Sequence, residues 1–196
     1  MNTEALPLFP LNSVLLPGGW LDLRIFETRY LDLVRDCTRH DTGFGIVLLR
    51  EGSETAVVGA VHEVGCEARI IDFSTLPDGL LGIRVEGRRR FRVRSEHSAA
   101  NALRVAQIAW CADVAPQPVP AQYAVLVTIL ERLAEHGDSQ LSAAAKSSFD
   151  DADWVSWRML ERLALDAPEK QVALELDDPL QRLQWIIEQL PRFQAE

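Results

Sequence analysis

Lysine is almost absent from this chain, since only Lys146 and Lys170 occur among its 196 residues. A phosphate-binding loop needs a glycine-rich run that ends in Gly-Lys-Ser or Gly-Lys-Thr. Ser147 follows Lys146, but three alanines precede the pair, so the sequence has no such loop. A catalytic dyad of Lys146 with Ser147 or Ser148 stays open on residue types alone, although such a lysine has to be buried and oriented. The motifs GxSxG and HExxH are also absent.

Cysteine and histidine are few and scattered. Cys37, Cys66 and Cys111 form no CxxC motif, and an odd, sparse set of cysteines is typical of a reducing compartment. His62 and Cys66 would share one face of a strand, but two possible ligands are fewer than a zinc site needs. We therefore predict no metal and no cofactor.

Long apolar runs and a secretory leader are lacking as well. Prolines at positions 7, 10 and 17 interrupt the N-terminal segment, and the first basic residue is Arg24. No apolar run approaches the roughly 20 residues that a membrane helix needs. We expect a cytoplasmic protein without a membrane partner. The formal net charge of −9 argues against general nucleic-acid binding.

The first part of the chain does contain segments in which apolar and polar residues alternate. Segment 80–94 follows a turn signal at residues 76–79 and alternates apolar with polar residues, which predicts a half-buried strand. Gly87 interrupts the alternation, and a glycine inside a strand usually marks a bulge or a bend. Beyond it, Phe91 and Val93 are expected inside and the arginines between and around them outside.

Other strands and one helix are predicted before residue 115. Pro7 indicates that its strand lies at a sheet edge, because proline cannot donate to a ladder. A helix over 27–39 is indicated by an apolar stripe at Tyr30, Leu33, Val34 and Cys37. Strands at such short spacing favour a barrel or closed sheet over a parallel α/β fold. The remaining strand segments are 5–9, 20–26, 44–50, 56–73 (two strands or one bent strand) and 103–110.

Prolines 116, 118 and 120 mark a boundary, because such a segment is stiff and extended. We predict two domains, a β-rich domain over residues 1–115 and an α-helical domain over 116–196, hence an α+β protein. Asp166 and Asp178 stand where helix N-caps belong, each shortly before a proline. Residues 139–150 are ambiguous. Helices are expected over 121–136, 154–165, 166–176 and 178–190.

Two surface features are candidates for function. One is a set of large apolar residues near turns, which would form a peptide-binding groove if exposed, although burial in the core is the default for each. These residues are Phe9, Leu11, Trp20, Leu76 and Leu80.

The other is an arginine strip on segment 84–94. Guanidinium groups suit phosphate, which makes nucleic-acid binding the alternative function. Acidic neighbours and the lack of interleaved aromatic residues favour a solvated strand face or ion pairing with the acidic helical part instead. The candidate nucleic-acid-binding residues are Arg88, Arg90, Arg92 and Arg94.

Three stretches resemble the N-terminal, substrate-binding domain of the Lon ATP-dependent proteases. They are LPLFPLNSVLLPGGWLDLRIFETRY (6–30), VGAVHEVGCEARI (58–70) and LPDGLLGIRVEGRRRFRV (76–93), in the family's order and spacing. The ETRY element and the GRRRF turn are the most specific pieces. The helical segments WRMLERLAL (157–165) and LDDPLQRLQWIIEQL (176–190) are also similar to the family's helical half.

The resemblance implies a PUA-like β-barrel followed by a helical bundle, and a role in engaging unfolded or tagged polypeptide. It also implies a link to an ATP-dependent protease as a partner. The family's ATPase and protease modules do not occur before the sequence ends at Glu196, so we expect a stand-alone, non-enzymatic binding module, with no catalytic residue carried over. Whether it is a monomer or a homodimer stays open.

Overall fold

The computed structural model describes residues 3–50 and 60–193. Within them the chain forms two compact units, Met1–Ala112 and Asp113–Glu196. The division falls just before the three prolines, whereas the sequence placed it after residue 115. Each unit is described by itself.

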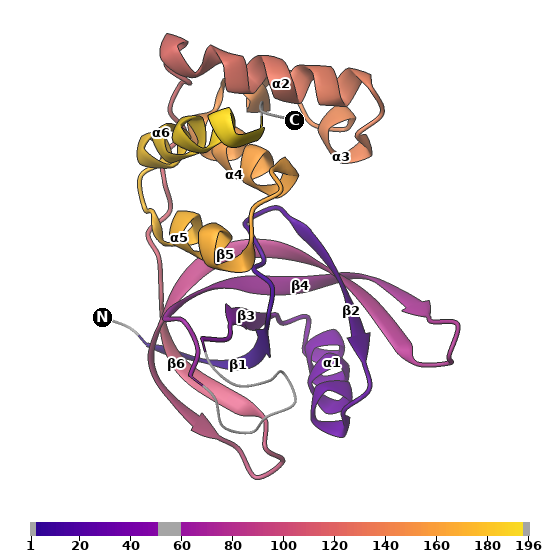
Figure 1. Ribbon diagram of the computed structural model, residues 1–196. Helices are drawn as coiled ribbons and strands as arrows, with labels where there is room; N and C mark the ends of the chain where they lie inside the picture. Colours follow the sequence, from indigo (N-terminus) through magenta and orange to yellow (C-terminus); the bar gives the residue numbers. More distant parts are fainter. Residues whose placement is uncertain (1–2, 51–59, 194–196) are drawn as a thin grey trace. The chain divides into compact units, whose positions relative to one another are not determined.

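Strand pairing joins distant parts of the first unit into one mixed sheet (Figure 1). Its order is β2-β5-β4-β3-β1-β6, and β6 also pairs with β5, so the order of pairing returns to β5. Of the predicted segment 56–73, the part from Val64 onward lies in β4, and residues 56–59 lie outside the described part. The strands are β1 (Glu4–Leu11), β2 (Trp20–Ile25), β3 (Phe44–Leu48), β4 (Val64–Thr75), β5 (Leu81–Ser98) and β6 (Arg104–Trp110).

The strand that carries Pro7 is not an edge strand, contrary to the sequence prediction. β1 lies between β3 and β6 in the sheet. Residues Glu4–Leu8 pair with β6, whereas Leu8–Leu11 pair with β3. Among the described residues, Pro7 therefore has a neighbouring strand on one side only, and its missing N–H is tolerated although β1 is a central strand.

The predicted bend at Gly87 is confirmed. The β4–β5 register shifts between Cys66 and Ala68, opposite the segment that begins at Gly87. A Cβ at Gly87 would lie 2.1 Å from the carbonyl oxygen of Leu16, so only glycine allows this approach. The backbone N–H of Gly87 donates to the Gly19 carbonyl, and the N–H of Gly18 donates to the Gly87 carbonyl.

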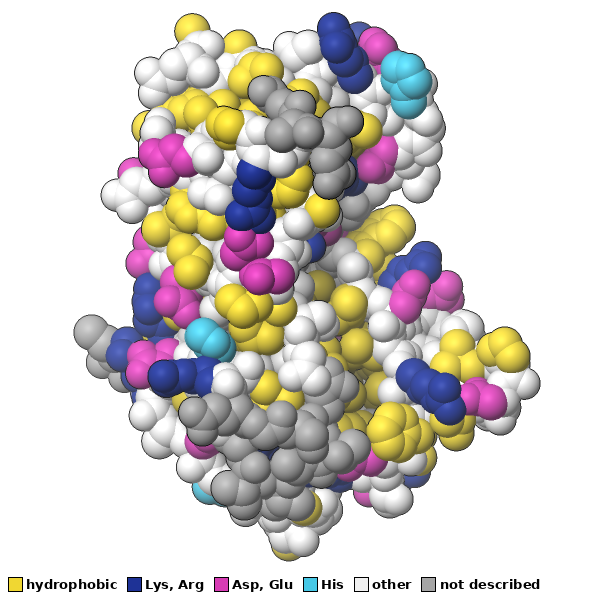
Figure 2. All heavy atoms as spheres, in the orientation of Figure 1, with side chains coloured by type: hydrophobic (Ala, Val, Ile, Leu, Met, Phe, Trp, Pro, Cys, Tyr) yellow, Lys and Arg dark blue, Asp and Glu magenta, His cyan; other side chains and the backbone are white. Residues whose placement is uncertain are grey.

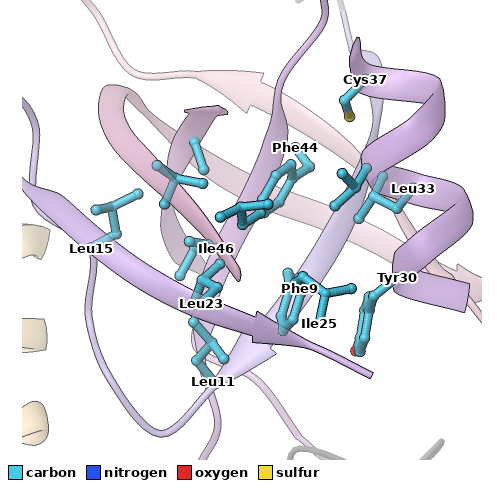
Figure 3. Packing of buried hydrophobic residues seen from close by; sticks show 14 of the residues in the cluster. Phe9, Leu11, Leu15, Leu23, Ile25, Tyr30, Leu33, Cys37, Phe44 and Ile46 are labelled. Carbon is cyan, nitrogen blue, oxygen red and sulfur yellow. The ribbon is translucent and has the colours of Figure 1, made fainter. Parts of the chain in front are cut away.

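Helix α1 (Thr28–His40) forms where the sequence predicted a helix, and its apolar residues pack with strand residues in one core cluster. Its buried apolar residues are the four that the sequence singled out, and Figure 3 shows three of them, Tyr30, Leu33 and Cys37, facing the strands. Tyr30 stacks on Phe9 with 3.9 Å between ring centroids, and Phe44 lies beside Phe9 at 5.9 Å. A smaller cluster built around Phe91 fills the other side of the central strands. Both faces of these strands are therefore packed.

The second unit is helical among its described residues. The ambiguous segment 139–150 forms α3 and a 3-10 turn. α4 packs against α2 and α6. The helices are α2 (Ala124–Glu135), α3 (Ser139–Ser142), α4 (Ala152–Arg162), α5 (Ala167–Glu175) and α6 (Pro179–Gln189).

Aspartate side chains cap the starts of four of these helices, and the sequence indicated two of them, Asp166 and Asp178. The other two are Asp138 at α3 and Asp151 at α4. Asp166 forms a capping box with Glu169 at the start of α5. Asp178 accepts a bond from the N–H of Leu180 at 2.9 Å, and Asp151 accepts one from Asp153 at the start of α4. These bonds satisfy backbone donors that have no partner inside a helix.

No helix in the described parts of the chain combines the length and the apolar character needed to cross a bilayer.

Candidate functional site

The structure separates the five residues of the predicted peptide groove. Phe9 and Leu11 lie in the core under α1, each only 6% exposed, because β1 runs through the middle of the sheet. These two side chains are therefore not part of a surface. Trp20, at the start of β2, is 47% exposed. Leu76 and Leu80 are half-buried at the turn between β4 and β5.

An apolar patch that the sequence analysis did not single out lies on the outer half of β4. Ile71 is 42% and Phe73 is 49% exposed. The signal was present in the run Ile70-Ile71-Asp72-Phe73, but periodicity does not tell which side of a strand is covered. A second register shift, between Ile70 and Asp72, places Ile71 outside the regular pairing.

This half of β4 forms an arm with β5, and one of its edges is open. β3 pairs with β4 only as far as Ala68. From Arg69 to Thr75, β5 is the only strand that pairs with β4 among the described residues. Figure 2 shows the arm at the right of the view, with hydrophobic side chains interspersed among arginine and acidic ones. An edge of this kind presents backbone donors and acceptors to another chain.

Two hollows flank the arm, and Phe73 lines both. The larger, of about 600 Å³, lies between the last turn of α1 and β4, where Cys37, Ile70 and Ile71 form its apolar part. The smaller, of about 340 Å³, lies over Gly82 and includes Leu76. A Cβ at Gly82 would lie 2.4 Å from Oγ of Ser74 and 3.0 Å from Cδ2 of Leu76, so the glycine lets these two side chains pack closely over β5.

Ion pairs hold the strands beneath the smaller hollow. Nε and Nη2 of Arg84 donate to the two carboxylate oxygens of Asp22 at 2.7 and 2.9 Å. The hydrogen bond from Arg84 lowers the pKa of the Asp22 carboxyl below its usual value. The Arg84 guanidinium also lies 5.7 Å from the ring centroid of Trp20. A second ion pair joins Arg24 of β2 to Asp78 in the turn between β4 and β5, with 2.5 Å between Nη2 and Oδ2.

The larger hollow has a rim of paired charges. Arg69 donates to the carbonyl of Asp41 and to Oε1 of Glu67, the second at 3.2 Å. Arg89 contacts Oε2 of Glu67 at 3.7 Å and lies over the ring of Trp110 at 4.0 Å. A ligand here would meet apolar surface between charges that already have partners.

The arginine strip does not form one exposed face. Arg88 and Arg94 are exposed, but Arg90 is buried and Arg92 is half-buried. The prediction that Arg90 points to solvent is wrong, because it pairs across the ladder with Cys66, on a side of the sheet that is also packed. Arg88 pairs with Glu86 at 2.7 Å, within the first unit, whereas the sequence analysis looked to the acidic helical part for such partners.

The residues weighed for catalysis or metal binding are far from suitable geometry. Lys146 and Ser147 are both exposed on the 3-10 turn Lys146–Asp150, whereas a serine–lysine dyad needs a buried lysine. Burial raises the pKa of the Cys66 thiol, so this cysteine is a poor thiolate ligand. His62 precedes β4 and is half-buried. Within residues 3–50 and 60–193, no group of three candidate ligands gathers.

The family of the chain follows from comparison with known proteins. The family model of the ATP-dependent protease La (LON) substrate-binding domain matches residues 5–192. The chain therefore belongs to the LON substrate-binding domain family, as the resemblance of its motifs implied.

Solved structures of this family have the same fold. The crystal structure of the Lon N-terminal domain protein from Xanthomonas campestris is 39% identical, with a TM-score of 0.78, over 95% of this chain and 98% of that one. The N-terminal domain of Lon protease from the Mycobacterium avium complex is 15% identical, with a TM-score of 0.67, over 94% and 97% of the two chains. The α+β prediction is confirmed at the level of a mixed sheet with helices.

Curated relatives are longer proteins. Lon protease from Cytophaga hutchinsonii is 24% identical over 94% of this chain, which covers 24% of that protein. Lon protease from Flavobacterium johnsoniae is 29% identical over 47% of this chain and 12% of its own length. This chain thus spans about a quarter or less of these two relatives.

Proposed function

We propose that this protein is a non-enzymatic module that binds unfolded or tagged polypeptide at the β4–β5 arm. Membership of a substrate-binding domain family supports the general role. The observation that carries the location is Phe73, a half-exposed aromatic residue that lines both hollows of the arm. Aromatic side chains at such positions anchor partners because they bury a large area.

Strand addition is the binding mode that the arm favours. An extended segment placed along Arg69–Thr75 would find an edge with no other strand on it among the described residues. Its backbone would supply affinity, and alternate side chains would enter the hollow beside Ile71 and Phe73. Leu76 and Leu80, at the end of the arm, extend this apolar surface. Because the charges of the rim are paired, we expect apolar side chains to be preferred over charged ones.

The finer description of the fold belongs to the same proposal. We assign the first unit to a PUA-like barrel, because the pairing of β6 with both β1 and β5 joins β5, β4, β3, β1 and β6 into a ring, with β2 outside it. We assign the second to a helical bundle that forms a separate domain, with residues 1–115 and 116–196 as the two domains. No cofactor takes part. The protein would act in the cytoplasm as an adaptor that delivers substrates to an ATP-dependent protease.

Binding of a permanently unfolded polypeptide tests the proposal. A reduced and alkylated protein with a fluorescent label is titrated with the full chain, and the fluorescence anisotropy is followed. We expect binding of the unfolded probe and much weaker binding of the same probe in its folded, oxidised form. Phe73→Ser is expected to weaken binding about tenfold, since it removes one buried aromatic anchor.

Val172→Ser is the matched control, because Val172 is 51% exposed on α5 of the other unit. It is expected to bind as the unchanged protein does. Equal binding by Phe73→Ser, with both variants folded by circular dichroism, would place the site elsewhere. Failure to bind either form of the probe would refute the function itself.

Nucleic-acid binding through Arg88, Arg92 and Arg94 is the second possibility, and burial of Arg90 weakens it. Phosphate contacts release counterions, so such binding must fall steeply as salt rises. A labelled single-stranded RNA titrated at two salt concentrations separates the two functions.

A further inference from the structure

We propose that the free edge of β2 pairs with the same edge of a second copy of this chain, which makes the protein a homodimer. β2 stands at the end of the sheet order and pairs only with β5 among the described residues. Its other edge therefore offers backbone donors and acceptors that a further strand can use.

The side chains of β2 are self-complementary in one antiparallel register. When two copies pair about Leu23, Leu21 of one copy lies opposite Ile25 of the other. Asp22 then lies opposite Arg24 in both halves of the pair, because the two-fold axis repeats each contact. Opposite charges at directly opposed positions stabilise a strand pair. A register centred on Asp22 would oppose two carboxylates instead, so charge selects the register on Leu23.

The aromatic residues at the two ends of β2 fit the same register. Trp20 begins β2 and Phe26 directly follows its last residue, and the two side chains are 47% and 56% exposed. Pairing about Leu23 brings Trp20 of one copy opposite Phe26 of the other, once at each end. Aromatic cross-strand pairs contribute to sheet stability. Both exposed rings thus gain a partner from a single symmetric contact.

Accessible charges support this assignment. The side chains of Asp22 and Arg24 are 70% and 59% exposed even though each already has a partner in its own chain. An exposed carboxylate or guanidinium can share its remaining oxygens or N–H groups with a second partner. The contact uses the edge of β2 that points away from β5. Asp22, Leu23 and Arg24 also line the smaller hollow, whereas the larger hollow, which Phe73 lines as well, includes no residue of β2.

A charge-exchange experiment on the full chain tests the dimer. Sedimentation velocity is measured over micromolar to submillimolar concentrations for the unchanged protein, Asp22→Arg, Arg24→Asp and an equal mixture of the two variants. The unchanged protein is expected to dimerise. Each variant opposes like charges twice, so its dimer should weaken about tenfold or more. The mixture should recover the dimer, because the arginines of one variant then face the aspartates of the other.

Two further variants keep the outcome decisive. Asp113→Arg makes the same charge change as Asp22→Arg outside the sheet and should dimerise normally. Trp20→Ser combined with Phe26→Ser leaves the ion pairs intact and should also weaken the dimer, which covers the case in which a charge variant does not fold. A monomeric unchanged protein overturns the proposal. So does a mixture that stays monomeric, or dimerisation that all β2 variants retain.

Discussion

The ring of Phe91 occupies the space that a side chain at Gly65 would need. A Cβ at Gly65 would lie 2.5 Å from Cζ of Phe91 and 2.5 Å from the carbonyl oxygen of Ile46. Gly65 belongs to the predicted strand segment 56–73. In the fold it is the position that lets β4 pass over an aromatic core residue.

Gly65→Ala is therefore expected to destabilise the protein by about 1–3 kcal/mol, because the added methyl group overpacks a site bounded by backbone. Chemical denaturation measures the change. Gly79→Ala is the comparison, since Gly79 has a φ of +82° and nothing within 4 Å of its Cβ position. It should cost about 1 kcal/mol through backbone conformation alone. Equal costs for the two variants would contradict the steric explanation.

Substitutions of Phe9 and Trp20 are expected to differ sharply in their effect on stability, although the sequence analysis placed both residues in the predicted peptide groove. Phe9→Ala removes a ring that stacks on Tyr30, so it should cost about 3–5 kcal/mol of stability. Trp20→Ala removes a half-exposed ring and one contact with Arg84, and should cost less than about 1 kcal/mol in the monomer. Thermal unfolding of both variants checks this, and a comparable loss in both would mean that Trp20 is part of the core.

Arg182 is fully buried, and we expect its substitution to reduce stability more than that of any other charged residue in the second unit. Its guanidinium contacts Asp153, donates to Ser156 at 3.1 Å and lies 3.7 Å from the ring centroid of Trp157. Arg182→Ala is expected to cost about 3–5 kcal/mol, because the partners lose a planar donor that nothing else replaces. Arg182→Lys should rescue little, since an ammonium group lacks the fork geometry.

Gln181→Ala serves as the control for Arg182, because Gln181 is the exposed neighbour on the same helix. It should leave the midpoint of urea denaturation nearly unchanged. If Arg182→Lys were as stable as the unchanged protein, a point charge would suffice and the geometric argument would fail.

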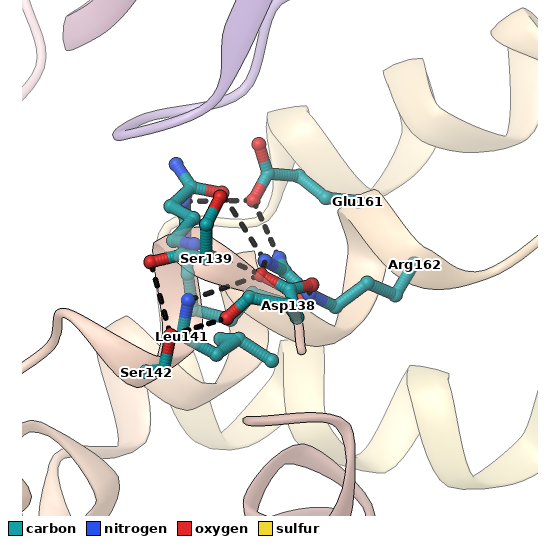
Figure 4. A network of polar contacts seen from close by, with 8 residues as sticks. Asp138, Ser139, Leu141, Ser142, Glu161 and Arg162 are labelled. Atoms are coloured by element: carbon teal, nitrogen blue, oxygen red, sulfur yellow. Dashed lines mark hydrogen bonds and ion pairs between the residues drawn. The ribbon is translucent and has the colours of Figure 1, made fainter. Parts of the chain in front are cut away.

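The bonds made by the Asp138 carboxylate predict that the free energy of unfolding falls in acid. Nε and Nη2 of Arg162 donate to it at 2.9 and 3.1 Å, while Nη1 of Arg162 reaches Glu161 at 3.0 Å (Figure 4). Burial alone would raise the pKa of Asp138, but the bonds from Arg162 and from the backbone N–H of Leu141 outweigh it, and the pKa is lowered. The stabilisation is present above the unfolded pKa and is lost as pH falls through the lower folded pKa.

Asp138→Asn keeps an N-cap but removes the charge, so it isolates the ion pair. At neutral pH we expect it to be about 1–2 kcal/mol less stable than the unchanged protein, and the gap should close in acid. Urea denaturation across pH measures both. For Glu161 the sign is opposite, because burial raises its pKa. The stability of Glu161→Gln relative to the unchanged protein should rise with pH, and a parallel response of the two variants would contradict these assignments.

Local signals in the sequence predicted the elements well. The apolar stripe on segment 27–39, the turn at residues 76–79 and the bend at Gly87 are all present in the structure. The caps at Asp166 and Asp178 are present too. Apart from the bend at Gly87, which also involves the approach of Leu16, each depends on neighbouring residues only, because helix periodicity, turn conformation and capping bonds act within a few positions of one another.

Exposure could not be predicted in the same way. Pro7 suggested an edge strand, and Arg90 was expected to face solvent, yet β1 is central and Arg90 is buried. A strand alternates between two faces, but the sequence does not state whether one face or both are covered. The open edge beside Phe73 was missed for the same reason, because it depends on β3 ending its pairing at Ala68.

The sequence by itself determined the helices and most strands, their turns and caps, and the family to which the chain belongs, because these follow from local patterns and from motifs in order. Only the tertiary structure decided which apolar residues remain at the surface, which strand edges stay open and which arginine is buried. Those properties depend on contacts between segments far apart in the chain, such as β1 with β3 and β1 with β6, and such contacts leave no mark in the local pattern.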